Sequence, residues 1–264
     1  TGVGREALHY VIGSSNTAIG YQAGFAITTA ASNVLIGKNC GVSLTTGGSN
    51  VAVGVNALDA ATTPTDNCAV GVATLGAVTT GSLNTGCGNS AGANATTGSN
   101  NTFIGCSAAT SGAPGGSVTT ASNGVYVADE SVTVAHIQVD WTIASDKRDK
   151  TDVSPLDLGL DFINKLEPVT YRWDKRSKYS DDQSVTPDGT HKEEKLEGGF
   201  LAQDVEVIEN QYGYKHSDKT NLITNLSEDG QMYGIKYSKL VPMLTKAIQE
   251  LSTKVEDLEK QLNN

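Results

Sequence analysis

Ser145 and Lys150 are the residues whose types and spacing first suggest chemistry in this sequence. A serine hydroxyl is a weak nucleophile that needs a general base, and a lysine amine can take its proton if the lysine pKa falls far below its usual value. Such a pair can cut a peptide bond. The spacing alone is a weak signal, and a solvated charged linker with an incidental serine explains it more simply.

The charges around Lys150 act in both directions. Lys147 and Arg148 favour its neutral form, as burial at an interface between chains would. Three neighbouring carboxylates oppose this effect: Asp146, Asp149 and Asp152. We therefore expect the site to be silent in the unfolded chain and to become active on assembly.

This junction separates two unlike halves of the chain. Eight of the 19 basic and 29 acidic residues precede residue 141, whereas 22 of the 29 glycines do. That contrast predicts a domain boundary. The net charge of -10 argues against a nucleic-acid partner, and no apolar run is long enough for membrane insertion. The chain begins without Met or a signal peptide, which suggests a fragment of a longer protein.

The first half contains a repeat of 17 residues, N-x-x-(I/V)-G-x-x-A followed by a polar Thr/Ser/Gly stretch. Six copies are in phase, with glycines at Gly20, Gly37, Gly54, Gly71, Gly88 and Gly105 and asparagines at Asn16, Asn33, Asn50, Asn67, Asn84 and Asn101. We expect a short strand per copy with its Ile or Val facing inward, a bend at the Gly and a ladder of stacked asparagines. The composition also fits disorder, but the phased apolar positions argue against it.

A unit this thin cannot bury an apolar face alone, so stacked repeats and other chains must cover it. The four cysteines, Cys40, Cys68, Cys87 and Cys106, form no C-x-x-C pair and have no histidine at metal-binding spacing. We expect them to be buried, reduced and small-hydrophobic in role. We expect no metal and no other cofactor.

Beyond the repeat, alternating apolar residues predict strands over 124–128 and 131–139, with Trp141 and Ile143 continuing the alternation. In the charged half, Ser154 and Pro155 predict a helix start. Leu156, Leu160, Ile163 and Leu166 would form its apolar face. A strand is expected over 169–173, a strand entering a helix over 198–205, and two strands around a Glu228-Asp229-Gly230 turn within 221–237.

The C-terminal residues 238–264 predict a coiled coil. Apolar residues recur at steps of three and four: Val241, Leu244, Ile248, Leu251, Val255, Leu258 and Leu262. β-Branched residues at a with Leu at d lean towards a dimer, so a trimer would have to override that preference. The alternative is one long amphipathic helix packed on its own domain.

Stretches such as SNTAIGYQAG, SNVLIGKNCG and SNVAVGVNAL resemble the head repeats of trimeric autotransporter adhesins and of many phage tail fibres. The resemblance implies a parallel β-roll or β-helix wound as a homotrimer.

The second half resembles the C-terminal intramolecular chaperone of phage tail spikes and fibres, the endosialidase-type self-cleaving family. Its motifs occur in order: Ser-Asp-x-x-x-Lys-x-Asp at 145–152, L-x-P-V-x-Y-x-W at 166–173, G-F-x-A-Q at 199–203, then the heptad helix. Asp149 stands where the family usually has an apolar residue. The resemblance implies cleavage between Ser145 and Asp146 by a dyad of Ser145 and Lys150.

Two features of the implied cleavage stay open. Attack of Ser145 on its own carbonyl would need a strained four-membered ring. The alternatives are attack of Ser145 on the carbonyl of a neighbouring chain and attack on the bond by a water that Ser145 assists. Gln203 could supply an amide for orientation or oxyanion contact, or have a structural role.

We therefore expect a mainly β repeat, a trimeric β-helix or β-roll, followed by an α+β chaperone domain that ends in a coiled-coil helix. The expected domains are 1–111 for the repeat, 112–145 for strands up to the cleavage site and 146–264 for the chaperone. The expected function is host-surface attachment as a homotrimeric phage tail-fibre tip, with a surface polysaccharide or lipopolysaccharide as receptor. The mature part would stay in the virion, and the chaperone would be released in the host cytoplasm.

Two other classes compete with this interpretation. A bacterial trimeric adhesin without self-cleavage explains the repeat but not the Ser145 motif. A polysaccharide-degrading tail spike would need paired carboxylates, which the repeat does not carry.

Overall fold

The computed structural model describes residues 1–180 and 184–263 and divides the chain into two compact units, each treated by itself below. The first comprises Thr1–Thr133, Asp174–His191 and Ser227–Met232, and the second comprises Val134–Trp173, Lys192–Leu226 and Tyr233–Asn264. Residue 264, the end of the predicted coiled coil, lies outside the described residues.

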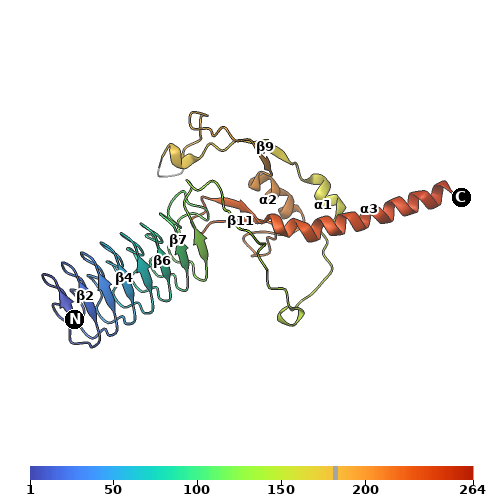
Figure 1. The fold of residues 1–264 in the computed structure, drawn as a ribbon. Helices are drawn as coiled ribbons and strands as arrows, with labels where there is room; N and C mark the ends of the chain where they lie inside the picture. Colours follow the sequence, from blue (N-terminus) through green and yellow to red (C-terminus); the bar gives the residue numbers. More distant parts are fainter. Residues whose placement is uncertain (181–183, 264) are drawn as a thin grey trace. The chain divides into compact units, whose positions relative to one another are not determined.

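The first unit is a parallel β-solenoid whose strands pair in chain order (Figure 1). Its strands are β1 (Gly2–Val3), β2 (Thr17–Ile19), β3 (Val34–Ile36), β4 (Val51–Val53), β5 (Cys68–Val70), β6 (Thr85–Cys87), β7 (Thr102–Ile104) and β8 (Val125–Val127). From β2 to β7 each residue pairs with the one 17 positions later, as Val34 does with Val51. The predicted repeat fold is therefore confirmed, with a longer last coil in which Thr102 pairs with Val125.

The residue that faces inward differs from the prediction. The middle residue of each strand from β2 to β7 is buried, as in Ala18, Leu35 and Ala52, whereas Ile19 before the glycine is 41% exposed. Because strand side chains alternate, burial of the middle residue turns both of its neighbours outward. The predicted inward Ile/Val column is wrong. Two other columns complete the core, one at Ala23, Cys40, Ala57, Thr74, Ala91 and Ala108 and one at Ile27, Leu44, Ala61, Val78 and Ala95.

The predicted asparagine ladder is confirmed. Asn33 Nδ2 donates to Asn16 Oδ1 at 3.0 Å, and Asn50 Nδ2 donates to Asn33 Oδ1 at 3.0 Å. The backbone amides of Asn84 and Asn101 continue the ladder to the preceding Oδ1. These amides are buried, so the ladder satisfies polar groups that would otherwise be costly to remove from water.

The repeated glycine has a steric cause, illustrated by Gly54. Its φ is +146°, and a Cβ there would lie 2.2 Å from the carbonyl oxygen of Gly71 in the next coil. Consecutive coils thus approach through their glycine backbones, and a side chain would force them apart.

The cysteines form no disulfide, as predicted, but their predicted burial is right for one residue of four. Cys40 is buried, Cys68 is half-buried, and Cys87 and Cys106 are exposed; all four are free thiols. Cys87 occupies the outward position that Ile19 has in its own coil, which explains its exposure.

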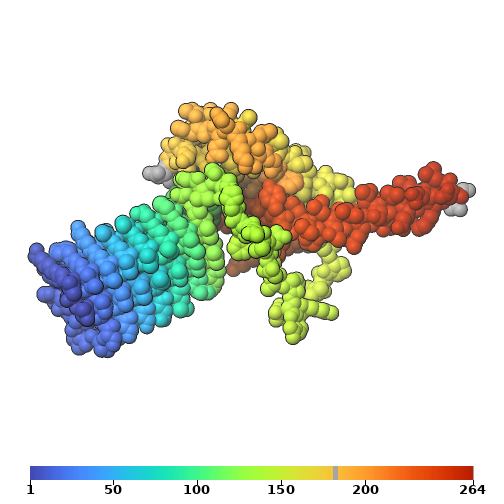
Figure 2. All heavy atoms as spheres, in the orientation of Figure 1, coloured from blue at the N-terminus to red at the C-terminus, as the bar shows by residue number. Residues whose placement is uncertain are grey.

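Residues 131–143 form no strand, although the structure describes every one of them. The predicted strand at 124–128 is present as β8, but the next one is wrong. Its apolar side chains are exposed, with Val139 at 74% and Trp141 at 81%. A strand needs a ladder partner, and the single chain supplies none here. The yellow-green atoms of this part of the chain form a single narrow thread (Figure 2).

The second unit contains α1 (Leu160–Lys165), β9 (Val169–Tyr171), β10 (Glu197–Gly199), α2 (Ala202–Gln211), β11 (Thr224–Leu226), β12 (Tyr233–Ile235) and α3 (Leu240–Leu262). The described residues also form three short 3₁₀ turns. The second unit contains η1 (Lys147–Asp149) and η3 (Tyr237–Lys239), and the first unit contains η2 (Arg176–Lys178). β9 pairs antiparallel with β10, and β11 with β12. The predicted strands over 169–173 and 221–237 and the strand-to-helix run over 198–205 are confirmed.

The helix predicted from Ser154 begins six residues later, at Leu160. Gly159 is the N-cap and has no side chain for capping, but Glu250 of α3 accepts a hydrogen bond from the Leu160 amide at 2.8 Å. The cap therefore comes from a residue 90 positions away, which local sequence signals cannot reveal. Leu158, Phe162 and Leu166 are the buried residues of this region.

Helix α3 has two apolar faces. Leu240, Met243 and Ala247 are buried against the second unit, whereas the predicted heptad residues are exposed: Val241, Leu244, Ile248, Leu251, Val255, Leu258 and Leu262. The two interpretations of this sequence therefore describe different faces of one helix. No helix formed by the residues that the structure describes has the length and apolar character to cross a bilayer.

Candidate active site at the junction

Ser145 and Lys150 are brought together at the junction. Lys150 Nζ donates a hydrogen bond to Ser145 Oγ at 2.6 Å and also lies 3.4 Å from the Ser145 carbonyl oxygen. The amine therefore faces both the hydroxyl and the carbonyl of the bond to Asp146. This is the nucleophile-to-base distance that general base activation requires.

The turn η1 produces this approach. Asp146 is its N-cap and accepts a hydrogen bond from the Arg148 amide at 2.9 Å, the usual capping role of an aspartate. The Lys150 amide donates to the Lys147 carbonyl at 3.3 Å, which closes the turn. One tight turn after Ser145 thus returns the lysine side chain to the serine.

Asp146 is held by Arg148 from two directions. Its carboxylate also accepts the Arg148 guanidinium, with a closest distance of 2.6 Å. The guanidinium and then the Arg148 amide lower the pKa of Asp146 below its usual value. One of the two cations near Lys150 is therefore engaged with a carboxylate of the opposing set.

Both dyad side chains are exposed in the single chain. Charged amines lose their proton more readily when they are removed from water, and nothing in the described part of the chain covers Lys150. Gln203 is an exposed residue in the first turn of α2, and none of the hydrogen bonds among described residues joins it to Ser145 or Lys150. The possible amide contact from Gln203 is absent from this geometry.

The other two motifs stabilise the second unit. Leu166 belongs to its core, and Tyr171 packs edge-on against Trp173 with ring centroids 5.4 Å apart. The Phe200 amide donates to the Tyr237 hydroxyl at 3.2 Å, which ties the G-F-x-A-Q motif to the turn before α3. These motifs explain a fold rather than a reaction.

Glu209 is a buried carboxylate that the sequence analysis did not single out. It is fully buried, and its carboxylate accepts hydrogen bonds from the amides of Leu222, Ile223 and Thr224 at 2.8–3.0 Å. A buried carboxylate with this many donors stabilises the start of β11. Its position on α2 gave no periodic or motif signal, because its partners lie 13–15 residues away in an irregular loop.

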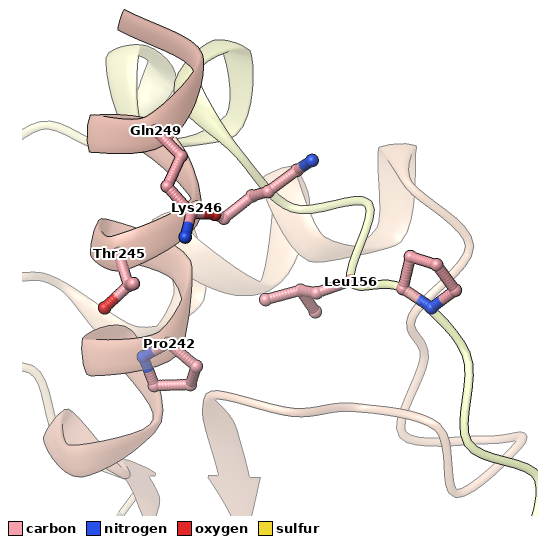
Figure 3. A pocket seen from close by; sticks show the side chains of 6 residues that line it. Leu156, Pro242, Thr245, Lys246 and Gln249 are labelled. Carbon is pink, nitrogen blue, oxygen red and sulfur yellow. The ribbon is translucent and has the colours of Figure 1, made fainter. Parts of the chain in front are cut away.

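An open groove of about 460 Å³ lies along α3 (Figure 3). It is lined by Pro155, Leu156, Pro242, Thr245, Lys246 and Gln249. The charged group lining it, Lys246, forms an ion pair with Glu250 at 3.4 Å. Its lining offers no converging polar groups of the kind that define a reaction site. Within residues 1–180 and 184–263, no cluster of three His, Cys, Asp or Glu side chains is placed to hold a metal.

Comparison with known proteins gives a family match that begins at the junction. Residues 145–214 match the family described as chaperone of endosialidase. The match starts at Ser145 and supports a tail-fibre-type protein with a C-terminal chaperone, and that family implies self-cleaving peptidase activity in general. No curated protein and no solved structure matches the chain.

Proposed function

We propose that this chain forms the tip of a phage tail fibre that attaches to the host surface as a homotrimer. In this proposal residues 146–264 are a chaperone that guides assembly and then releases itself by cutting the Ser145–Asp146 bond. The supporting observation is the 2.6 Å hydrogen bond between Lys150 Nζ and Ser145 Oγ at the first residue of the family match.

Neutral Lys150 takes the proton of Ser145 Oγ in the proposed reaction. The oxygen attacks a Ser145 carbonyl carbon, the bond to Asp146 nitrogen breaks, and that nitrogen leaves with the proton as an amine. Water then hydrolyses the ester and restores the serine. Because attack on the residue's own carbonyl is strained, the carbonyl of a neighbouring protomer is the acceptor, or Ser145 activates a water that attacks directly.

Assembly would supply the condition that the single chain lacks. Covering Lys150 with neighbouring protomers would remove water from the amine and so disfavour its charged form, and the reaction would follow trimer formation. The exposed heptad face of α3 supports such an assembly, since Ile248 and Leu258 are 63% and 58% exposed. The outward column Ile19, Ile36, Val53, Val70, Cys87 and Ile104 is a second apolar surface available to other protomers.

The proposal predicts that the purified chain separates on a denaturing gel into fragments of 145 and 119 residues. Ser145→Ala and Lys150→Ala remain uncut, because each removes one member of the dyad. Lys150→Arg also remains uncut, since arginine keeps the charge but stays protonated at neutral pH. Lys192→Ala, at an exposed lysine outside the junction, is the matched control and still cuts.

Normal cutting by Lys150→Ala would overturn the dyad. An intact wild-type chain under every assembly condition would favour the alternative, a trimeric adhesin-type binding protein without self-cleavage. After cutting, the mature part would remain in the virion, and the chaperone would be left in the host cytoplasm.

A further inference from the structure

The coils of the solenoid are joined by a repeated polar ladder. At one position per coil a threonine amide donates to the carbonyl of the threonine in the next coil: Thr28, Thr45, Thr62, Thr79, Thr96 and Thr119. The distances from Thr28 to Thr119 run from 2.7 to 3.0 Å. The threonine hydroxyls donate to the same carbonyls, as Thr96 does to Thr119 at 3.0 Å. Each coil therefore needs a following coil to accept these donors.

Thr119 belongs to the last coil, so no following carbonyl exists for it. Its amide donates instead to the Glu228 carboxylate at 3.0 Å, and its hydroxyl points at the same group at 3.4 Å. Glu228 also accepts the amides of Thr120 and Ala121 at 3.0 and 3.1 Å and the hydroxyl of Thr120. The carboxylate occupies the place of the missing coil.

Asp229 does the same at a second position of the ladder. The amides of Ala26, Ser43, Ala60 and Ala77 each donate to a carbonyl of the next coil. The equivalent amide in the last coil, that of Ser117, donates to Asp229 Oδ2 at 2.9 Å. Gly116 permits this approach, because its φ is +72° and a Cβ there would lie 2.8 Å from Asp229 Oδ1. All these residues belong to the first compact unit.

We propose that the amides of Ser117, Thr119, Thr120 and Ala121 form a carboxylate-binding site, which Glu228 and Asp229 occupy in the intact chain and an acidic sugar occupies after they leave. This inference rests on the proposed function, since residues 227–232 belong to the part of the chain that leaves once the Ser145–Asp146 bond is cut. The site then presents four unpaired amides beside the hydroxyls of Ser117, Thr119 and Thr120. Amides bind the carboxylate, and the hydroxyls suit the hydroxyl groups of a sugar.

The test uses the full chain with Ser145→Ala in every protein, so that self-cleavage does not enter. The parent keeps Glu228 and Asp229; the test variant adds Glu228→Ala and Asp229→Ala. Glucuronate is the probe and glucose the neutral control, and binding is read from the amide resonances of ¹⁵N-labelled threonines. We expect glucuronate to shift Thr119 and Thr120 in the test variant with at least about tenfold higher apparent affinity than in the parent, where the internal carboxylates compete.

Thr28, Thr45 and Thr62 report on the fold of the remaining coils and should not move. If the alanine variant loosens the last coil, Glu228→Gln with Asp229→Asn keeps the side-chain shape without the charge and should give the same order of affinities. Equal shifts in parent and variant, equal shifts with glucose, or no shift in either variant would overturn the site. Binding of the peptide Ser-Glu-Asp-Gly-Gln-Met without binding of glucuronate would overturn the acidic-sugar ligand. None of these outcomes changes the gel test of self-cleavage.

Discussion

The side chains of the dyad and the carboxylate of Glu228 have different surroundings. Ser145 and Lys150 are joined by a short hydrogen bond but face water, whereas Glu228 is surrounded by donors from one coil. A dyad exposed to water keeps its lysine charged, and the lysine has to lose a proton before it can act as a base. A carboxylate among amides is already in its preferred charged form. The dyad therefore needs a change in its surroundings before it can react, whereas the Glu228 carboxylate already has its hydrogen-bond donors.

Acid should weaken the contact of Glu228. Desolvation works to raise the pKa of Glu228, but the Thr120 hydroxyl and the amides of Thr119, Ala121 and Thr120 outweigh it and lower the pKa from 4.5 to about 2. Because the folded pKa lies below the unfolded one, the stabilisation is complete above pH 4.5 and is lost as the pH falls towards 2. A ¹³C NMR titration of the Glu228 carboxyl group should therefore have a midpoint well below 4.5.

The titration signals of two neighbouring side chains have to be distinguished from that of Glu228. Asp229 contacts the same coil and has a lowered pKa, and the charge of Glu228 adds to burial in raising the pKa of Tyr126. The signals are therefore assigned residue by residue. Glu228→Gln should lack the acid transition, and a Glu228 midpoint at or above 4.5 would contradict the observed contacts.

At the scale of elements, each coil depends on its neighbours for hydrogen bonds. A strand of three residues has no stability of its own, and the buried asparagine ladder links four consecutive coils side chain to side chain. Its members are satisfied on both sides, so removing one leaves partners in two other coils without bonds. The ladder is therefore the place where one substitution acts on several elements.

Asn50→Ala should destabilise the solenoid by about 1–3 kcal/mol or more. The change removes the acceptor for the Asn67 amide and the donor to the Pro64 carbonyl, both buried. Thermal or denaturant unfolding followed by circular dichroism measures the loss. Asn89→Ala is the control, because Asn89 is exposed and lies outside the ladder. Equal stability of the two variants would show that the ladder contributes nothing net.

At the scale of the whole molecule, both units expose apolar side chains in regular patterns. The outward strand column, the alternating residues of 131–143 and the heptad face of α3 would be unfavourable in a chain that stays alone. Each pattern is regular enough to meet identical copies of itself. The chain is thus expected to complete its structure with other protomers.

Leu251→Ser should weaken self-association without unfolding the second unit. Leu251 is 49% exposed on the heptad face, whereas Met243 on the opposite face is 2% exposed. Analytical ultracentrifugation should show a dissociation constant for self-association at least about tenfold higher, because each protomer loses a leucine that assembly would bury. Self-cleavage should slow in parallel if assembly activates Lys150.

Met243→Ser provides the contrast. It should lower the melting temperature of the second unit, since Met243 packs in its core. If Leu251→Ser left association unchanged, the heptad face would not be the assembly surface.

Sequence alone determined the features that depend on spacing. The 17-residue period, the amide ladder and the C-terminal helix follow from it because equal spacing places equal residues at equal positions. The adjacency of Ser145 and Lys150 was visible only in the structure, because their spacing alone was a weak signal and one turn joins them. Tertiary structure decided which side of each strand faces inward, where α1 begins and which face of α3 is free. It also showed that Glu228 and Asp229, a turn in the sequence, accept the donors of the last coil, because partners more than 100 residues apart leave no local signal.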